Sequence, residues 1–246
     1  MARVDFHPMN NLFSIGLVFA SSSLLGSARA VTETREFDLK NLTQVVVENS
    51  VGSTEVSVTP GTKAVVEYDK KEFPDACRLA IDRSGHKLVV NVGHSISGML
   101  SHIRCDVNLV VRVPQRVGVK STSESGSINV VGTNGELELA SKSGDLIADG
   151  TFSKIAVRSA SGNVNIKGVA GSGDVKTESG AVTLSMSSAA LAGKLSVKTE
   201  SGAGMIYLPK GTPVKTNFES KIGTFSNELG NQESAAYKIL LKTKSG

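Results

Sequence analysis

The fold is decided by the stretch from residue 137 to residue 184, which reads LELASKSGDLIADGTFSKIAVRSASGNVNIKGVAGSGDVKTESGAVTL. A Ser-Gly pair recurs within it at Gly144, Gly162 and Gly180, so these glycines stand 18 residues apart. The same motif ends at Gly126 one interval earlier, and at Gly202 after a longer interval of 22 residues. Three equal intervals in succession indicate a structural repeat, and a fixed period of this length is typical of stacked architectures.

Apolar and polar residues alternate on both sides of each Ser-Gly pair. After Gly162, for example, Asn165 separates Val164 from Ile166. This period of two predicts a half-buried strand on each side of a turn. Glycine suits the turn because it adopts positive φ at little cost. The predicted structural turns are Gly126, Gly144, Gly162, Gly180 and Gly202.

One strand-turn-strand unit of 18 residues cannot bury its apolar face alone. Copies stacked in register pair their backbones at about 4.8 Å and align their apolar residues in ladders. Residues 117–246 are therefore predicted to form a regular, Ser-Gly repeat β-solenoid (β-helix), and the whole chain an all-β fold. We expect an irregular, β-rich N-terminal part over 31–116, with strands over 45–48, 54–58, 64–68, 79–82, 87–92 and 106–113. Whether this part begins the same solenoid with longer loops or forms a separate β cap stays open.

The N-terminal part also holds two candidate copies of the corner. Residues 50–52 and 83–85 both end in glycine and are read as degenerate corners. At the other end, the sequence stops on Ser245-Gly246. We expect the last coil to lack a good cap there and to leave an open edge.

The first thirty residues are typical of a signal peptide. An apolar run from Leu12 to Leu25 ends in Ser27-Ala28-Arg29-Ala30, a small-x-small pattern that a signal peptidase cuts. We expect cleavage after Ala30 and a mature chain over 31–246 in the periplasm or at the cell surface. The start codon is open between Met1 and Met9. No other stretch approaches 18 apolar residues, so no transmembrane anchor is expected.

Composition narrows the function classes. Of 246 residues 25 are glycine and none is tryptophan, and strong helix formers are too scarce for a helical bundle. The formal charge of +4 is small and evenly spread, which argues against a nucleic-acid partner.

Two cysteines, Cys77 and Cys105, remain in the predicted mature chain. An even pair in an exported protein is read as one disulfide, and two reduced buried thiols are the alternative. Either reading is structural, because neither cysteine belongs to a Cys-x-x-Cys motif.

Stacking in register predicts a surface. Arg158, Lys176 and Lys198 each lie four residues before a corner glycine and are expected to form a basic ladder. Glu124, Lys142, Glu178 and Glu200, two residues before a glycine, partly offset it. The ladder is either a solvated face balanced by weak ion pairs or a contact stripe for an anionic glycan or lipid head group.

A second candidate contact site is the loop over 93–102. It carries Ile96, Met99 and Leu100 among serine, glycine and histidine. Exposed apolar residues on a loop between strands mark a contact site, and packing beneath the solenoid is the alternative.

Catalytic and metal-binding patterns are weak. Asp145, Asp149 and Asp174 are the residue type of a polysaccharide-cleaving site, but they do not recur in one register. Three histidines eight residues apart, His86, His94 and His102, match no metal-ligand spacing. We predict a non-enzyme without cofactor or metal.

The Ser-Gly-x-Val-x-Val units resemble those of the bacterial putative-adhesin domain family of unknown function, which is related to auto-transporter adhesin head (GIN) domains. The predicted export signal, the first strand Val45-Val46-Val47-Glu48-Asn49 and the closing Gly223-Thr224-Phe225 carry the same resemblance. It covers nearly the whole mature chain and is clearest over 117–225. The resemblance implies a β-solenoid and offers no catalytic motif.

These observations together lead us to expect an exported, non-enzymatic, adhesin-like binding module of the cell envelope. Its repetitive face would contact a surface polymer, glycan or protein. The alternatives are a periplasmic architectural or regulatory protein that binds a partner through the 93–102 loop or the open C-terminal edge, and a polysaccharide-active β-helix enzyme. The oligomeric state is left open.

Overall fold

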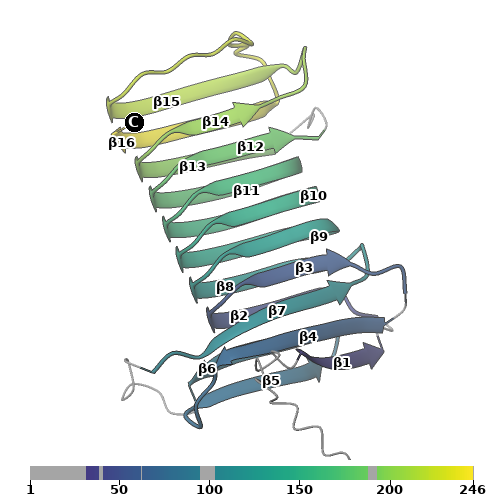
Figure 1. The fold of residues 1–246 in the computed structure, drawn as a ribbon. Helices are drawn as coiled ribbons and strands as arrows, with labels where there is room; N and C mark the ends of the chain where they lie inside the picture. Colours follow the sequence, from purple (N-terminus) through teal and green to yellow (C-terminus); the bar gives the residue numbers. More distant parts are fainter. Residues whose placement is uncertain (1–31, 39–40, 62, 95–102, 188–192, 246) are drawn as a thin grey trace, which may run out of the picture.

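The computed structural model describes residues 32–38, 41–61, 63–94, 103–187 and 193–245. All regular elements in these ranges are strands (Figure 1). Their bounds are β1 (Thr32–Asp38), β2 (Gln44–Val51), β3 (Thr54–Val58), β4 (Lys63–Glu72), β5 (Cys77–Ser84), β6 (Lys87–His94), β7 (Asp106–Val113), β8 (Gly118–Ser125), β9 (Ile128–Ser143), β10 (Leu146–Ser161), β11 (Val164–Ser179), β12 (Val182–Met186), β13 (Gly193–Ser201), β14 (Gly204–Tyr207), β15 (Val214–Ile222) and β16 (Tyr237–Ser245). The prediction of an all-β solenoid is confirmed.

The strands stack in parallel as successive coils of one solenoid. Leu146 of β10 pairs with Ile128 of β9 on one side and with Val164 of β11 on the other. Each coil thus lies directly above the residues 18 positions earlier in the chain. A longer step separates β11 from β13, where Val175 pairs with Val197.

The stack has two layers, which we call layer A and layer B. In the regular coils, layer A holds the strands that run into the Ser-Gly corners, and layer B holds the strands that leave them. Layer A has the order β5, β6, β2, β8, the C-terminal halves of β9, β10 and β11, then β13, β16 and β15. Layer B has the order β1, β4, β7, β3, the N-terminal halves of β9, β10 and β11, then β12 and β14.

Apolar side chains from both layers meet in a continuous core. Layer B contributes a ladder that includes Leu146, Val164 and Val182, and layer A contributes Val157 and others at equivalent positions. All of these side chains are buried. Full burial of one such side chain stabilises a fold by about 1.5–3 kcal/mol, so repeating the pattern in every coil holds the stack together.

The corner glycines adopt the positive φ that the sequence predicts. Gly162, at φ 117°, lies against the carbonyl of Gly144 in the coil below, so a Cβ at Gly162 would come within 2.3 Å of that oxygen. Both the torsion and the close approach require glycine here. The other predicted turns, Gly126, Gly144, Gly180 and Gly202, have the same character.

The N-terminal part combines the two arrangements that the sequence left open. β2 and β3 form a coil in register with β8 and β9, while β4, β5 and β1 run antiparallel and cover the end of the stack. All six expected strands are present, but the sequence pattern missed β1, a charged edge strand. The reading of 83–85 as a corner is wrong, because Gly85 lies in the two-residue turn of the antiparallel β5–β6 hairpin.

The C-terminal end also differs from expectation. The last strand, β16, is not the open edge, because it lies between β13 and β15 and pairs with both (Figure 1). The strand at the edge of layer A is β15, while layer B stops at β14. Residues 223–236 connect β15 to β16, and the ring of Phe225 stacks on that of Phe218 at 4.9 Å between centroids.

Candidate binding groove

A groove of about 910 Å³ runs along the outer face of layer A. It crosses eight strands, from β6 through β2, β8, β9, β10, β11 and β13 to β16. At about 4.8 Å per strand this gives a length of roughly 34 Å. Its walls are two rows of outward side chains, four and two residues before each corner, and its floor is the backbone between them.

One wall carries a row of cations in consecutive coils. Arg158 pairs in register with Lys176, and Lys176 with Lys198. Lys242 of β16 continues the row beyond Lys198. Like charges placed directly opposite on neighbouring strands repel, so this row opposes folding unless anions balance it.

The chain balances two of these four charges. Lys176 forms an ion pair with Asp174 at 2.8 Å, and Lys242 forms one with Glu219 at 2.8 Å. Partial burial is the largest single effect and opposes ionisation of Asp174, but Lys176, Ser196 and the charge of Lys198 together outweigh it and lower the pKa of Asp174. The hydrogen bond and charge of Lys242 likewise lower the pKa of Glu219.

The other two cations make no hydrogen bond or ion pair with any described residue. Arg158 faces Ala160 across the groove, so nothing acidic stands opposite it in its own coil. Lys198 acts on Asp174 and Glu219 only through its charge, and lowers the pKa of both. These two side chains are the ones that an external anion would meet.

The opposite wall is mixed in sign. Glu124 pairs with Lys142 at 2.8 Å and Glu200 with Lys244 at 2.5 Å, while Glu178 has no ion pair among the described residues. Over all described lining residues the groove has six cationic and four acidic side chains. The cations gather toward the C-terminal end.

The N-terminal end of the groove is lined by carboxylate and amide side chains. Glu48 accepts a hydrogen bond from Asn91, and the hydroxyl of Ser50 donates to the Val92 carbonyl at 2.9 Å. The two ends of the groove therefore differ in charge, which orients any charged ligand along it.

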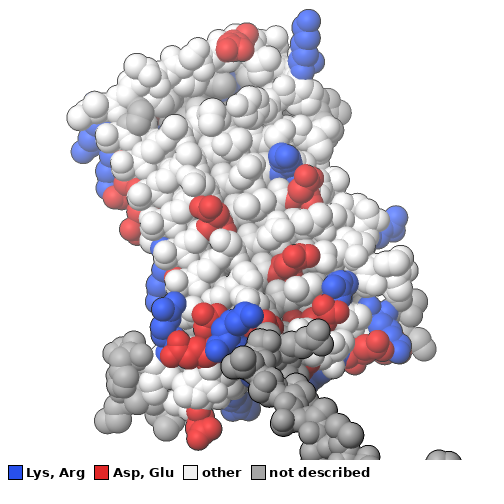
Figure 2. Space-filling model, viewed as in Figure 1, with Lys and Arg blue, Asp and Glu red and all other residues white. Residues whose placement is uncertain are grey.

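The outer face of layer B differs from the groove face in the distribution of its charges. Figure 2 shows it mostly white, with scattered acidic and basic side chains across its middle and more charges along one side of the stack and around its N-terminal end. Among the described residues, no helix is long and apolar enough to pass through a bilayer.

A row of hydroxyls lies beneath the groove floor. It consists of Ser123, Ser141, Ser159, Thr177, Thr199 and Thr243, which are all buried. Most of these hydroxyl oxygens have no hydrogen-bond partner among the described residues, and burial without a partner costs free energy. Neighbouring coils are too far apart for direct bonds between them.

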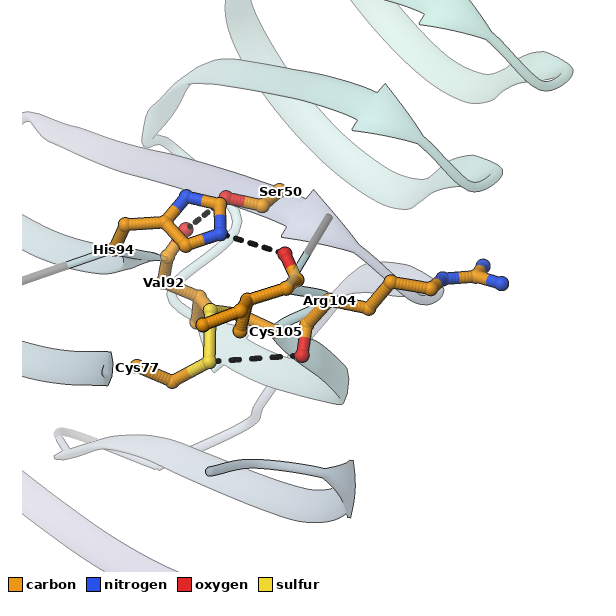
Figure 3. The surroundings of a disulfide bond; sticks show 7 residues. Ser50, Cys77, Val92, His94, Arg104 and Cys105 are labelled. Atoms are coloured by element: carbon orange, nitrogen blue, oxygen red, sulfur yellow. Dashed lines mark hydrogen bonds between the residues drawn. A yellow bond between two sulfur atoms is a disulfide. The ribbon is translucent and has the colours of Figure 1, made fainter. Parts of the chain in front are cut away.

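The predicted disulfide between Cys77 and Cys105 is present, with 5.6 Å between the two Cα atoms. Figure 3 shows it beside His94, whose Nε2–H donates to the Ile103 carbonyl at 2.7 Å. The disulfide joins the start of β5 to the residue before β7, and the hydrogen bond joins the end of β6 to the segment before β7. The contact residues predicted between them, Ile96, Met99 and Leu100, lie outside the described residues.

The aspartates considered for catalysis occupy three separate places. Asp145 sits at a corner, where its Oδ1 accepts a hydrogen bond from the Asn163 amide at 2.8 Å. Asp149 lies in layer B and Asp174 in layer A beside Lys176. Among the described residues no three His, Cys, Asp or Glu side chains form a group able to hold a metal ion.

The structure thus brings together Arg158, Lys176 and Lys198, and adds Lys242 and Lys244 to them. The sequence analysis missed these two lysines because β16 pairs with β13 across 44 residues. A signal for them exists. Residues 242–246 read KTKSG, which matches KTESG at 176–180 and 198–202.

Comparison with known proteins places these features in a family. The sequence profile described as Toastrack DUF4097 matches residues 41–246. No curated protein matches the chain.

Among solved structures, the chain is similar to a putative adhesin from Bacteroides fragilis, with 12% identity over 87% of this chain and 97% of that one and a TM-score of 0.44. A putative cell adhesion protein from Clostridium sporogenes is 13% identical over 88% and 95% of the two chains, with a TM-score of 0.33. A putative lipid binding protein from Parabacteroides distasonis is 14% identical over 88% and 98%, with a TM-score of 0.32.

Proposed function

The chain belongs to the Toastrack DUF4097 family, and we propose that it is an exported, non-enzymatic, adhesin-like module that binds a linear cell-envelope polymer in the groove on layer A. The polymer is an anionic glycan or a similarly charged chain, and it lies along the solenoid axis. The relation to adhesin head domains stays a prediction.

One observation carries the proposal. The cations Arg158, Lys176, Lys198 and Lys242 stand in register in four successive coils. They line an open groove, and two of them have no partner among the described residues. A row of neighbouring like charges costs folding free energy, and a bound polyanion would remove that cost.

Several weak contacts would supply the affinity. One exposed ion pair contributes about 0.2–1 kcal/mol, so four contacts give roughly 1–4 kcal/mol. A polymer that repeats its charge along the groove gains more by engaging successive coils, because each later contact forms at high effective concentration. Binding of this kind weakens as salt is added.

Export and localisation belong to the same proposal. The apolar run from Leu12 to Leu25 and the cleavage pattern ending at Ala30 support passage to the periplasm or cell surface. The buried disulfide supports it too, since disulfides persist in oxidising compartments.

The test compares two triple variants by binding to immobilised heparin, a linear sulfated glycan, with neutral dextran as the blank. The first variant changes Arg158, Lys176 and Lys198 to glutamate. The matched control changes Lys87, Lys154 and Lys167 to glutamate. These three lysines are exposed outside the groove and form no ion pair with described residues. Both variants carry the same change in net charge.

We expect salt-sensitive capture of the wild type and of the control, and at least a tenfold loss for the groove variant. Tenfold corresponds to about 1.4 kcal/mol, well within what three reversed contacts supply. Equal loss in both variants would show that only net charge matters and would refute the groove. Capture that survives in the groove variant would refute it as well.

A further inference from the structure

Large apolar side chains gather at the C-terminal end of the solenoid. The described residues expose seven of them, and five lie between residues 205 and 229. These five are Met205 (46% exposed), Tyr207 (56%), Ile222 (72%), Phe225 (42%) and Leu229 (39%). Isolated exposed apolar residues are ordinary, but a cluster at one end of a molecule marks a contact surface.

Four of these five side chains, all except Ile222, line a second groove of about 570 Å³. Its floor is the inner side of layer A, with Phe218 and Leu241, and one wall is β14. The other wall is the segment over 224–229. The groove exists because layer A continues through β16 and β15 after layer B has ended at β14, which pairs only with β12 among the described strands.

The size of this surface matches one side of a dimer interface. With about 200 Å² for a large apolar side chain, the five exposed fractions leave roughly 500 Å² of apolar area. A standard interface covers about 800 Å² on each partner, and about 56–65% of it is apolar. The apolar area that one partner contributes to such an interface is therefore roughly equal to the apolar area exposed at this end.

The charges around the cluster suit a contact with an identical surface. Lys210 and Lys221 are exposed beside it, and the exposed Glu228 lines the groove. None of the three forms an ion pair with a described residue. A two-fold contact sets a surface against its own copy, so a rim with both signs allows lysines of one copy to meet the glutamate of the other.

At the opposite end, the part of the chain that the structure describes exposes no large apolar side chain. There β1 forms the edge of layer B, and Glu33, Arg35 and Glu36 make that edge charged. Charged edge strands prevent sheet-to-sheet association. A filament in which the C-terminal end of one copy contacts the N-terminal end of the next is therefore disfavoured. A two-fold dimer in which the two C-terminal ends meet is favoured.

We infer that two copies of this chain associate through their C-terminal ends, with the apolar cluster around β14 and residues 222–229 at the centre of the contact. The two grooves share Thr199, Lys242 and Thr243, but none of the five apolar side chains lines the layer A groove, so the inference does not depend on the proposed polymer.

The experiment measures molar mass by light scattering during size exclusion, on protein purified from cells that express the full chain. It compares the wild type with Tyr207→Glu and Ile222→Glu over a series of micromolar concentrations. Ile147→Glu is the matched control, because Ile147 is 42% exposed on the outer face of layer B in the middle of the stack. Circular dichroism checks that each variant is folded.

We expect a dimer for the wild type and for Ile147→Glu, and a dimer dissociation constant at least tenfold higher for the two end variants. A wild type that stays monomeric at every concentration would overturn the inference. This holds even if the end surface were then found to bind an apolar peptide or an amphiphile. A dimer that the end variants leave unchanged, or that Ile147→Glu weakens equally, would place the contact elsewhere and overturn it too.

Discussion

Replacing Gly162 by alanine tests whether the corners fix the spacing of the coils. The residue has φ 117°, and a Cβ there would lie 2.3 Å from the Gly144 carbonyl oxygen and 2.7 Å from its carbon. Both atoms are backbone, so relief requires the two coils to separate at this corner. The hydrogen bond from the Gly144 amide to the Ser161 carbonyl, at 3.2 Å, would stretch with them.

The expected loss of stability is large. Positive φ costs a residue with a Cβ about 1–2 kcal/mol. Overpacking adds about 1–3 kcal/mol, and a weakened hydrogen bond about 0.5–1.5 kcal/mol. The free energy of unfolding of Gly162→Ala should therefore fall by roughly 3–6 kcal/mol.

Gly85→Ala is the matched control. Gly85 also has positive φ, at 58°, but a Cβ there would meet no atom within 4 Å. Its loss should be about 1–2 kcal/mol, the cost of the torsion alone. Urea unfolding followed by circular dichroism gives both values from the midpoint and the slope. If Gly162→Ala loses no more than Gly85→Ala, the corners do not determine the coil spacing.

Three further predictions concern the interior. Changing Cys77 and Cys105 to alanine should lower the unfolding free energy by about 3–4 kcal/mol, since the bond closes a 28-residue separation; a reducing agent should destabilise the wild type but not the variant. Burial raises the pKa of Tyr237 to about 12, against about 10 in an unfolded chain, so this tyrosine's contribution is complete below pH 10 and is lost as the pH rises through 12, at about 1.4 kcal/mol per unit; Tyr237→Phe should remove that part of the alkaline loss, and an unchanged alkaline slope in urea titrations would contradict it. Thr177→Val should stabilise the fold by about 1 kcal/mol, because it replaces a buried hydroxyl that has no hydrogen-bond partner in the described part of the chain by a methyl group of similar shape; a lower thermal midpoint would show that the hydroxyl does have a partner.

The regular half of the solenoid could be predicted because its information is local. A glycine that needs positive φ, the serine before it and the alternation around it all lie within a few residues. Equal spacing then sets the register, and the register places Arg158, Lys176 and Lys198 in one row. The candidate groove follows from the same reasoning.

The order of the coils could not be predicted, because the corners are chemically alike. Any Ser-Gly corner stacks well on any other, and the apolar ladders of different coils are equivalent. β2 therefore lies between β6 and β8, neither of which is next to it in the chain, and β16 lies between β13 and β15, although β13 comes three strands earlier in the chain. For this reason the sequence did not predict that Lys242 lies in the basic row, and only the structure shows it.

A glycine with positive φ also serves more than one purpose. Gly85 resembles the corner glycines in sequence, yet Ser84 pairs with Lys87 across it in an antiparallel hairpin. Two-residue hairpin turns and solenoid corners both require glycine. A hairpin turn and a solenoid corner differ only in the direction of the strand that follows. A short stretch of sequence does not contain that information.

The position of β16 has a consequence for mechanical load. The strand pairs with β13 through eight residues and with β15 through eight residues. A force that pulls on the chain beyond Ser245 along the strand direction must therefore shear both ladders at once, whereas an edge strand gives way along one side only. A module that holds a polymer on its side and is tethered at this point would transmit tension through the middle of its own sheet.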